Sequence, residues 1–343
     1  MPELERDSTA ANEAETWESQ LRRAFRAMVV ARTLESKLAS LYKAGKIVGG
    51  VYIGPGQEAI SASIGSCLSW DHDIFSALIR DQAGRTAFGE PMLDATRSYL
   101  GSAKGPSRGR DGNIHRGRPN NGLPAMISHL GAMVSVVTGM LLARRIKGCL
   151  DGVVGAASVG DGASSTGSFH EAMNTAAVEK LPLVVVLTNN QFAYSTPTDR
   201  QFACKSLVDR AVGYGVPGYE VDGTDLTATL RVISEAVRNA REGGGPQLVV
   251  ANALRLSGHG EHDDASYVPE QLRKSPLGRD CMEVAEHQLL STGLITEAEL
   301  LAWREEATED VQAAVAQAQQ EPAPDPFADD WTVYASKEIA TIS

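Results

Sequence analysis

The sequence lacks the segments that would place it in a membrane or outside the cell. It contains no apolar run of 18 residues, so no stretch is long enough for a membrane-spanning helix. Its four cysteines lie far apart and form no C-x-x-C pair, which excludes the common zinc and redox spacings and favours a reducing compartment. The N-terminal stretch MPELERDSTAANEAETWESQ has neither the apolar core of a secretory signal nor the basic character of a transit peptide. We therefore expect a cytoplasmic protein with no membrane partner.

An excess of positive charge is also missing. The formal net charge is −11 at pH 7, which argues against binding to nucleic acid or to anionic membranes. With 43% hydrophobic and 22% charged residues, the chain has enough apolar material for a large buried core. Its length of 343 residues suits one large α/β domain or two smaller ones.

Apolar runs of strand length alternate with helical patterns in the middle of the chain. The runs GVVGAASV (152–159), LPLVVVLTN (181–189) and QLVVANAL (247–254) are continuous, as is typical of strands buried on both faces of a parallel sheet. Residues 167–180 and 225–242 between them carry the helical period. We predict an α/β fold with a doubly wound, mainly parallel sheet and helical additions at both ends.

Helical patterns and one long loop complete the predicted organisation. Residues 1–16 are interpreted as a flexible arm and residues 17–343 as a single domain. Further helices are predicted over 17–44, from Gln57, over 129–148 and over 297–319. The Gly- and Arg-rich stretch 101–123 is predicted to be a loop, and one so long is usually functional or disordered. Its arginines could form a plain solvated loop; we favour an active-site loop that orders with cofactor and partner.

Two polar side chains follow consecutive predicted strands. Asp161, in the motif GDG, comes directly after the first strand, and Asn190 ends the pair NN after the next. Because the carboxyl ends of parallel strands meet at one edge of a sheet, these oxygens should converge there. Together with a loop carbonyl they suit Mg²⁺, which often shares its coordination sphere with phosphates. An ordinary turn residue is the alternative for Asp161; its pairing with Asn190 favours a metal and diphosphate site.

The motif GDG followed by NN resembles the signature of thiamine diphosphate enzymes. The longer segments IGPGQEAISASIG, IRDQAG, GRDGNIH, GDGASSTGSFHEAMN and SGHGEHDDASY occur here in that order. Together they resemble the alpha subunit of the thiamine diphosphate-dependent decarboxylase component of 2-oxo acid dehydrogenase complexes, a group that includes pyruvate, branched-chain and acetoin dehydrogenases. The resemblance runs from about Leu21 to the C-terminus and implies a thiamine diphosphate-binding fold with Mg²⁺.

The resemblance implies a role for individual residues. Asp161 and Asn190 would bind Mg²⁺ with the backbone carbonyl of Phe192. Arg80 would grip the diphosphate, and His259, which we also take as catalytic, would reach it from a mobile loop. The other cofactor-binding positions are Gly160, Gly162 and Ala163 at the diphosphate, and Ser128 and Leu130 at the aminopyrimidine. An ordinary core position is the alternative for Leu130.

Two positions depart from the family pattern. Ile79 stands where the family usually has Tyr, so one hydroxyl contact to phosphate is expected to be missing. Val250 stands where many relatives have Glu.

The resemblance also implies partners. In the family, the glutamate that activates the cofactor belongs to a separate beta subunit, so this chain should be inactive alone. A heterotetramer of two alpha and two beta chains is implied, with a lipoyl-bearing acyltransferase as acyl acceptor and a 2-oxo acid or acetoin as substrate. One alternative is a split transketolase-like half that transfers a two-carbon unit. The other is a non-catalytic, cofactor-binding regulatory subunit, for which Ile79 and Val250 leave room.

Overall fold

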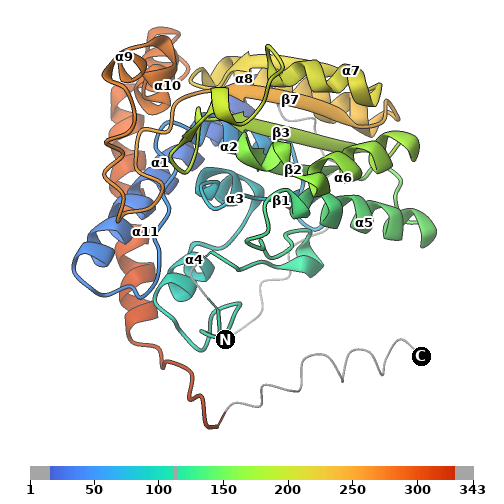
Figure 1. Ribbon diagram of the computed structural model, residues 1–343. Coiled ribbons are helices and arrows are strands. Elements are labelled where there is room, and N and C mark those ends of the chain that lie inside the picture. The colour runs from blue at the N-terminus through green and yellow to red at the C-terminus, as the bar shows by residue number, and fades with distance from the viewer. Residues whose placement is uncertain (1–15, 112–113, 329–343) are drawn as a thin grey trace.

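The computed structural model describes residues 16–111 and 114–328, and a parallel five-stranded sheet forms its centre (Figure 1). Its order β1-β2-β3-β7-β6 confirms the predicted mainly parallel α/β fold, and each predicted strand is present. The strands are β1 (Ile74–Ser76), β2 (Gly155–Gly160), β3 (Leu183–Asn189), β6 (Gly218–Asp222) and β7 (Gln247–Asn252).

The three central strands end together. Gly160 of β2 pairs with Thr188 of β3, and Asn189 of β3 pairs with Asn252 of β7. All run in the same direction, so the residues that follow them emerge at one edge of the sheet. That edge carries Asp161 and Asn190.

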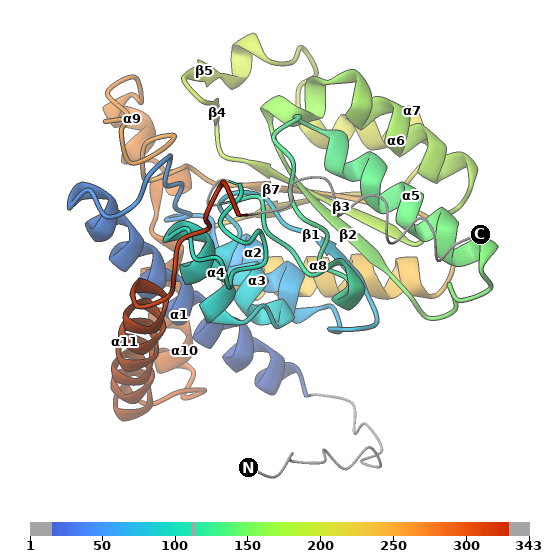
Figure 2. The same ribbon diagram turned by 90° about the horizontal axis from the view of Figure 1, so that it is seen from below.

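Helices cover both faces of the sheet (Figures 1 and 2). On β3, Val185 and Leu187 pack into the core beneath α5 (Ala132–Ile146) and α6 (Gly167–Val178). The alternate residues Val184 and Val186 pack into the core beneath α2 (Glu58–Ser66) and α8 (Leu226–Arg241). Every residue of the strand interior is therefore buried, which is why its sequence is a continuous apolar run.

The helical additions form a separate layer beside the sheet. The long helices α1 (Trp17–Lys43) and α11 (Glu297–Gln319) pack against each other and against α10 (Cys281–Ser291), and their core includes Phe25 and Leu289 (Figure 1). Local capping fixes where both long helices start. The Thr16 hydroxyl accepts a hydrogen bond from Ser19 N at 3.2 Å, and Thr296 forms a capping box with Glu299. Both helices are confirmed over nearly the predicted ranges.

Several elements had no signal in the sequence because they are short or polar. Strand β1 has three residues, and β6 exposes most of its side chains at the sheet edge, so neither produces an apolar run. Helix α5 begins three residues later than predicted because Gly131 before it is left-handed, with φ of 78°. The remaining elements are α3 (Gln82–Phe88), α4 (Met92–Tyr99), α7 (Arg210–Tyr214), α9 (Glu270–Arg273), β4 (Phe192–Ala193), β5 (Thr196–Pro197) and the 3-10 turns Pro119–Asn121, Gly162–Ser165, Thr198–Arg200, Leu207–Asp209 and Pro276–Gly278.

Two further expectations concern the ends of the chain and the membrane. Apart from Thr16, the predicted arm 1–16 lies outside the described residues. Among the helices of the described ranges, none is both long and apolar enough to cross a membrane.

The long loop 101–123 is fastened to the helices by ion pairs. The Arg116 side chain is buried and donates to both carboxylate oxygens of Glu90 at 3.0 Å, while Arg85 donates to the same carboxylate at 3.0 Å. Arg118 pairs with Asp94 at 2.5 Å. Because Arg116 is buried, the alternative of a plain solvated loop is wrong for this part; Gly112 and Asn113 lie outside the described residues.

We predict that Glu90→Gln destabilises the protein at pH 7 by about 3–5 kcal/mol, since it leaves buried arginines without their counter-charge. Burial alone would raise the pKa of Glu90, but Arg116 and Arg85 outweigh it and hold the pKa below its ordinary value of 4.5. A lowered pKa contributes stability that is present above the ordinary value and disappears as the pH falls. Thermal unfolding at pH 7 and pH 4 should therefore show a smaller difference at pH 4.

Glu286→Gln is the control for that measurement. Glu286 forms an ion pair with Arg304 at 2.6 Å whose side chains remain partly exposed, and such pairs contribute about 0–1 kcal/mol. Equal unfolding temperatures for Glu90→Gln and Glu286→Gln would contradict the structural role of Glu90.

Candidate functional site

Polar side chains gather where the sheet's strands end. Arg80 follows β1, Asp161 follows β2, Asn190 follows β3 and Arg255 follows β7. All four are buried, with exposed fractions between 2% and 7%. Buried charges are costly unless they are paired or bind a ligand, so this edge is the candidate site.

Asp161 both caps a turn and keeps a carboxylate available. One oxygen accepts from Gly162 N at 3.0 Å, and the other accepts from Gln201 Nε2 at 3.2 Å. A carboxylate offers about four acceptor positions, so two contacts do not saturate it. Burial raises the pKa of Asp161 despite these hydrogen bonds, so a cation placed at this carboxylate would stabilise its ionised form. The turn and the metal-ligand interpretations are thus compatible.

The segment after β3 presents an amide and a carbonyl from a constrained loop. Asn190 Nδ2 donates to Gln57 Oε1 at 3.0 Å, and its Oδ1 accepts from Phe192 N at 3.3 Å. The neighbouring residues Gln191 and Tyr194 have positive φ angles of 75° and 56°. Left-handed conformations of such residues are strained and cluster at functional sites.

Arg255 binds the loop after β3 through the loop's carbonyls. The sequence did not predict this residue as part of the site. Its guanidinium donates to the carbonyls of Phe192 at 3.4 Å and Tyr194 at 2.9 Å, and its Nε donates to Ser257 O at 3.1 Å. Burial lowers the pKa of Arg255, and the Asp161 carboxylate opposes that change. A cation therefore already contacts the carbonyl that we expect to bind Mg²⁺. A signal was present, because Arg255 follows an apolar strand as Asp161 does.

The structure brings Arg80 and His259 into direct contact. The Arg80 guanidinium donates to His259 O at 2.5 Å, lies 3.3 Å from His259 Nδ1 and donates to Ile53 O at 2.9 Å. Burial and the nearby Arg255 lower the pKa of Arg80 to about 10, so it stays cationic at neutral pH. Burial and Arg80 lower the pKa of His259 to about 4, so its ring is neutral there.

Asp263 shapes the loop that carries His259. Its carboxylate accepts from His259 N at 2.6 Å, from Ala265 N at 3.0 Å and from Tyr267 Oη at 2.7 Å. Although burial would raise it, these hydrogen bonds lower the pKa of Asp263 to about 2. The Tyr194 ring packs on the His259 ring with centroids 4.4 Å apart. The described form of the loop is thus fixed by local hydrogen bonds.

Ser128 and Leu130 lie on the segment before α5. Leu130 is 64% exposed, which excludes the alternative that it is a core residue. Its carbonyl accepts from Thr166 Oγ1 at 3.3 Å and from Ser168 Oγ at 3.1 Å, so it lies beside the turn that follows Asp161. Ser128 Oγ lies 2.7 Å from His115 Nε2.

The predicted backbone positions Gly160 and Gly162 differ in the space around them. A Cβ at Gly160 would meet no atom within 4 Å, whereas one at Gly162 would lie 2.5 Å from Ala193 Cβ. Glycine at 162 therefore lets the turn after β2 approach the loop after β3. Ala163 is buried beside them.

Two buried carboxylates behind the site support Arg80 and Gln57. Glu35 accepts from Gly54 N at 3.0 Å, and Glu58 accepts from Gly56 N at 2.8 Å, which fixes the loop 53–57. Burial and the nearby Glu58 raise the pKa of Glu35 to about 8. Sequence reasoning missed Glu35, because nothing local marks a buried carboxylate on the long helix α1.

The departures Ile79 and Val250 differ in their surroundings. Val250 is fully buried in β7 and packs into the core shared with α5 and α6, so an apolar residue suits that position. Ile79 is half-buried just before Arg80 and supplies no hydroxyl group.

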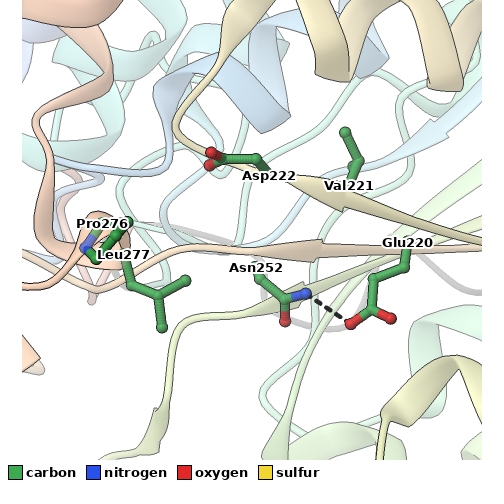
Figure 3. A pocket seen from close by; sticks show the side chains of 6 residues that line it. All are labelled: Glu220, Val221, Asp222, Asn252, Pro276 and Leu277. Carbon is green, nitrogen blue, oxygen red and sulfur yellow. Dashed lines mark hydrogen bonds between the residues drawn. The ribbon is translucent and has the colours of Figure 1, made fainter.

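A shallow pocket of about 310 Å³ opens beside the site, at the ends of β6 and β7 (Figure 3). Asn252 donates to Glu220 there at 2.8 Å and accepts from Asn189 at 2.8 Å. None of the predicted site residues lines this pocket, so we do not assign it to the cofactor. Its lining residues are Glu220, Val221, Asp222, Asn252, Pro276 and Leu277.

A second group of possible metal ligands lies away from the sheet edge. Glu58, Asp280 and Cys281 come together within the described ranges. Arg32 forms ion pairs with both Glu58 and Asp280, so a guanidinium already serves as the cationic partner of these two carboxylates. The donor set that fits Mg²⁺ remains the Asp161 carboxylate, the Asn190 amide oxygen and the Phe192 carbonyl.

The chain is similar to one family of known proteins over most of its length. The model of the dehydrogenase E1 component family matches residues 26–327. The alpha subunit of acetoin:2,6-dichlorophenolindophenol oxidoreductase from Cupriavidus necator is 33% identical over 88% of this chain and 90% of its own length. The 2-oxoisovalerate dehydrogenase alpha subunit of Bacillus subtilis is 32% identical over 84% of this chain and 90% of its own length. The pyruvate dehydrogenase E1 component alpha subunit of Rhizobium meliloti is 31% identical over 88% of this chain and 86% of its own length.

We predict that Glu35→Gln stabilises the protein at pH 8, by roughly 2 to 4 kcal/mol, and has little effect at pH 5. A carboxyl whose pKa rises on folding, here from 4.5 to about 8, contributes stability below the lower value and loses it as the pH approaches the higher one. Glutamine removes this loss and can still accept from Gly54 N. Thermal unfolding between pH 5 and pH 8 measures the effect. Glu305→Gln, on the exposed face of α11, is the control, and a variant no more stable than wild type at pH 8 would refute the assignment.

Proposed function

This chain belongs to the dehydrogenase E1 component family, and we propose that it is the alpha subunit of a thiamine diphosphate-dependent 2-oxo acid or acetoin dehydrogenase. The observation that carries the proposal is the buried sheet edge. Asp161 and Asn190 offer oxygen ligands at this edge. Arg80 offers a cationic hydrogen-bond donor there, and His259, which contacts Arg80, offers a neutral one. This combination suits a metal-bound diphosphate.

Mg²⁺ would be held by Asp161, Asn190 and the carbonyl of Phe192. The unsaturated Asp161 carboxylate and its raised pKa support this, because a divalent cation would compensate its burial. Arg255 donates to the Phe192 carbonyl. When the metal binds, this carbonyl would either contact both cations or lose its hydrogen bond to Arg255. The backbone at Gly160, Gly162 and Ala163 would face the diphosphate, where a side chain at Gly162 has no space.

Arg80 and His259 would also bind the diphosphate. Arg80 supplies a fixed positive charge, and charge-assisted hydrogen bonds to phosphate are strong. His259 is neutral at pH 7 because its pKa is about 4, so it would donate one hydrogen bond without adding a second positive charge beside Arg80. Ile79 offers no hydroxyl there, so the family's tyrosine contact would be absent.

Thiamine diphosphate would supply the nucleophilic carbon and the electron sink for decarboxylation or carbon–carbon cleavage. The contribution of this chain is to bind, orient and exclude water. The exposed Leu130 side chain would press against the cofactor as an apolar wedge, and Ser128 would contact its aminopyrimidine.

We propose a beta subunit as the obligatory partner, in a heterotetramer of two alpha and two beta chains. The relatives described above are named alpha subunits, which supports a second kind of chain. The exposed apolar side chains of Ile127 and Leu130 beside the site are consistent with a surface that the partner covers. A lipoyl-bearing acyltransferase would accept the acyl group, and the cytoplasm remains the expected location.

We predict that the purified chain alone has no turnover and that the complex with its beta subunit does. The chain should be tagged in its host, purified gently and assayed with pyruvate, branched-chain 2-oxo acids and acetoin, using a dye as electron acceptor. Full turnover by the single chain would refute the proposal. Transfer of a two-carbon unit without an electron acceptor would favour the transketolase-like alternative, and a complex that binds cofactor without turnover would favour a regulatory subunit.

We predict that Asp161→Asn weakens Mg²⁺-dependent binding of thiamine diphosphate to the complex by about 100-fold, since it removes the charged metal ligand. Isothermal titration calorimetry with and without Mg²⁺ measures this. Asp199→Asn, an exposed substitution in the turn Thr198–Arg200, is the control and should bind as wild type does. Unchanged affinity in Asp161→Asn would show that Asp161 is a turn residue alone.

A further inference from the structure

Two glutamines stand directly behind the side-chain oxygens that we assign to Mg²⁺. Gln57 contacts Asn190, and Gln201 contacts Asp161. We propose that Gln57 and Gln201 are positioning residues, which orient these two ligands and each offer one further polar atom to the bound metal–diphosphate group. This inference rests on the proposed function and deepens it.

Gln57 fixes the direction of the Asn190 amide. It lies on the loop before α2, is 4% exposed, and accepts from Asn190 Nδ2 at 3.0 Å through its Oε1. The two polar atoms of an amide point to opposite sides. With Nδ2 held by Gln57, Oδ1 is directed toward Phe192 and accepts from its backbone N at 3.3 Å. Without Gln57, the amide could rotate and present its N–H₂ group to the metal.

The other atom of the same side chain is an unused donor. Gln57 Nε2 is buried and has no hydrogen-bond partner within the part of the chain that the structure describes. Buried donors are almost always paired, so an orphan beside a ligand site points to a group that the ligand supplies. A phosphate oxygen or a metal-bound water has the acceptor chemistry that this N–H₂ group requires.

Gln201 fixes the direction of the Asp161 carboxylate in the same way. Its Nε2 donates to Asp161 Oδ2 at 3.2 Å and to the carbonyl of Thr196 at 2.8 Å, which ties the carboxylate to the hairpin β4–β5. Its Oε1 is buried without a partner among the described residues. That oxygen lies 3.7 Å from the position a Cβ would take at Gly162, so it borders the turn after Asp161. Because an amide oxygen only accepts, its partner would be the metal or a metal-bound water and not a phosphate oxygen.

A neutral amide suits both positions for the same physical reason. Each glutamine orients a ligand without adding charge to an edge where Arg80, Asp161 and Arg255 are already buried. A carboxylate at position 201 would lose its donor and repel Asp161. Residues that orient metal ligands typically change metal affinity by about 10- to 100-fold when they are removed.

The test compares Gln57→Met and Gln201→Met in the alpha–beta complex. Methionine keeps the length of the side chain and removes both polar atoms. Binding of Mn²⁺, followed by electron paramagnetic resonance in the presence of thiamine diphosphate, should weaken by about 10- to 100-fold in each variant. Thermal unfolding of the same samples shows whether the fold is intact.

Gln247→Met is the matched control. Gln247 is fully buried and donates to Gly245 O at 3.0 Å, but it begins β7 and therefore lies at the opposite edge of the sheet. The substitution should lower the unfolding temperature and leave Mn²⁺ affinity unchanged. An equal loss of Mn²⁺ affinity in this variant would show that the effect comes from a buried amide in general and would overturn the proposal.

A double substitution separates positioning from a merely structural role. If Gln57 acts through Asn190, then Gln57→Met should change Mn²⁺ affinity by less than about 2-fold in an Asn190→Ala background. A full additional loss there would overturn the proposed route.

Gln57→Glu tests the two atoms of Gln57 separately and covers the case in which Gln57→Met fails to fold. The carboxylate can still accept from Asn190 Nδ2 but lacks the second donor. The Gln57→Glu variant should keep its Mn²⁺ affinity within about 3-fold of wild type, and its binding of thiamine diphosphate should weaken by about 10-fold. Unweakened binding of thiamine diphosphate would refute the donor role of Nε2.

The outcome also separates this inference from the function on which it rests. A wild-type complex that binds neither Mn²⁺ nor thiamine diphosphate would refute the proposed function. A wild-type complex that binds both, with unchanged affinities in Gln57→Met and Gln201→Met, would refute the role of the glutamines alone.

Discussion

The burial of opposite charges at one edge of a parallel sheet is the constraint on which the rest of the structure depends. Arg80, Asp161 and Arg255 are removed from water there, and each needs hydrogen bonds that its own strand cannot provide. Carbonyls of the loops 53–57, 190–194 and 257–268 accept hydrogen bonds from the two arginines, while Gly162 and Gln201 donate to Asp161. Satisfying the buried charges therefore determines the path of the loops that form the site.

The site combines rigid and constrained parts. The strands β2, β3 and β7 are buried on both faces, so the residues that follow them have little freedom. The loop after β3 holds Gln191 and Tyr194 in left-handed conformations, and Arg255 binds this loop through the carbonyls of Phe192 and Tyr194. Strain of this kind fixes the backbone around the Phe192 carbonyl, which we propose as a metal ligand. Pre-organisation lowers the entropy that binding costs.

Buried carboxylates near the site divide into two kinds, and the difference is their partners. Glu90 lies between two guanidinium groups and is an ionised structural link to the loop 101–123. Glu35 accepts a backbone hydrogen bond instead, and its pKa of about 8 keeps it mostly protonated at neutral pH, so that it adds little negative charge near Arg80. An ionised glutamate thus binds the loop 101–123 through ion pairs, whereas a protonated one binds the loop 53–57 through a backbone hydrogen bond.

The sequence by itself determined the parallel sheet, the long helices at both ends and the positions of Asp161 and Asn190. Each of these depends on a local pattern: a continuous apolar run, a helical period with caps, or a polar residue at a strand end. Only the tertiary structure decided that Arg80 meets His259, that Gln57 and Gln201 stand behind the predicted ligands, that Arg255 joins the site and that Leu130 is exposed. Most of these contacts join segments far apart in the chain, and such pairs leave no periodic or spacing signal. The short strands β1 and β6 escaped prediction likewise, because pairing across the sheet, and not their own composition, makes them strands.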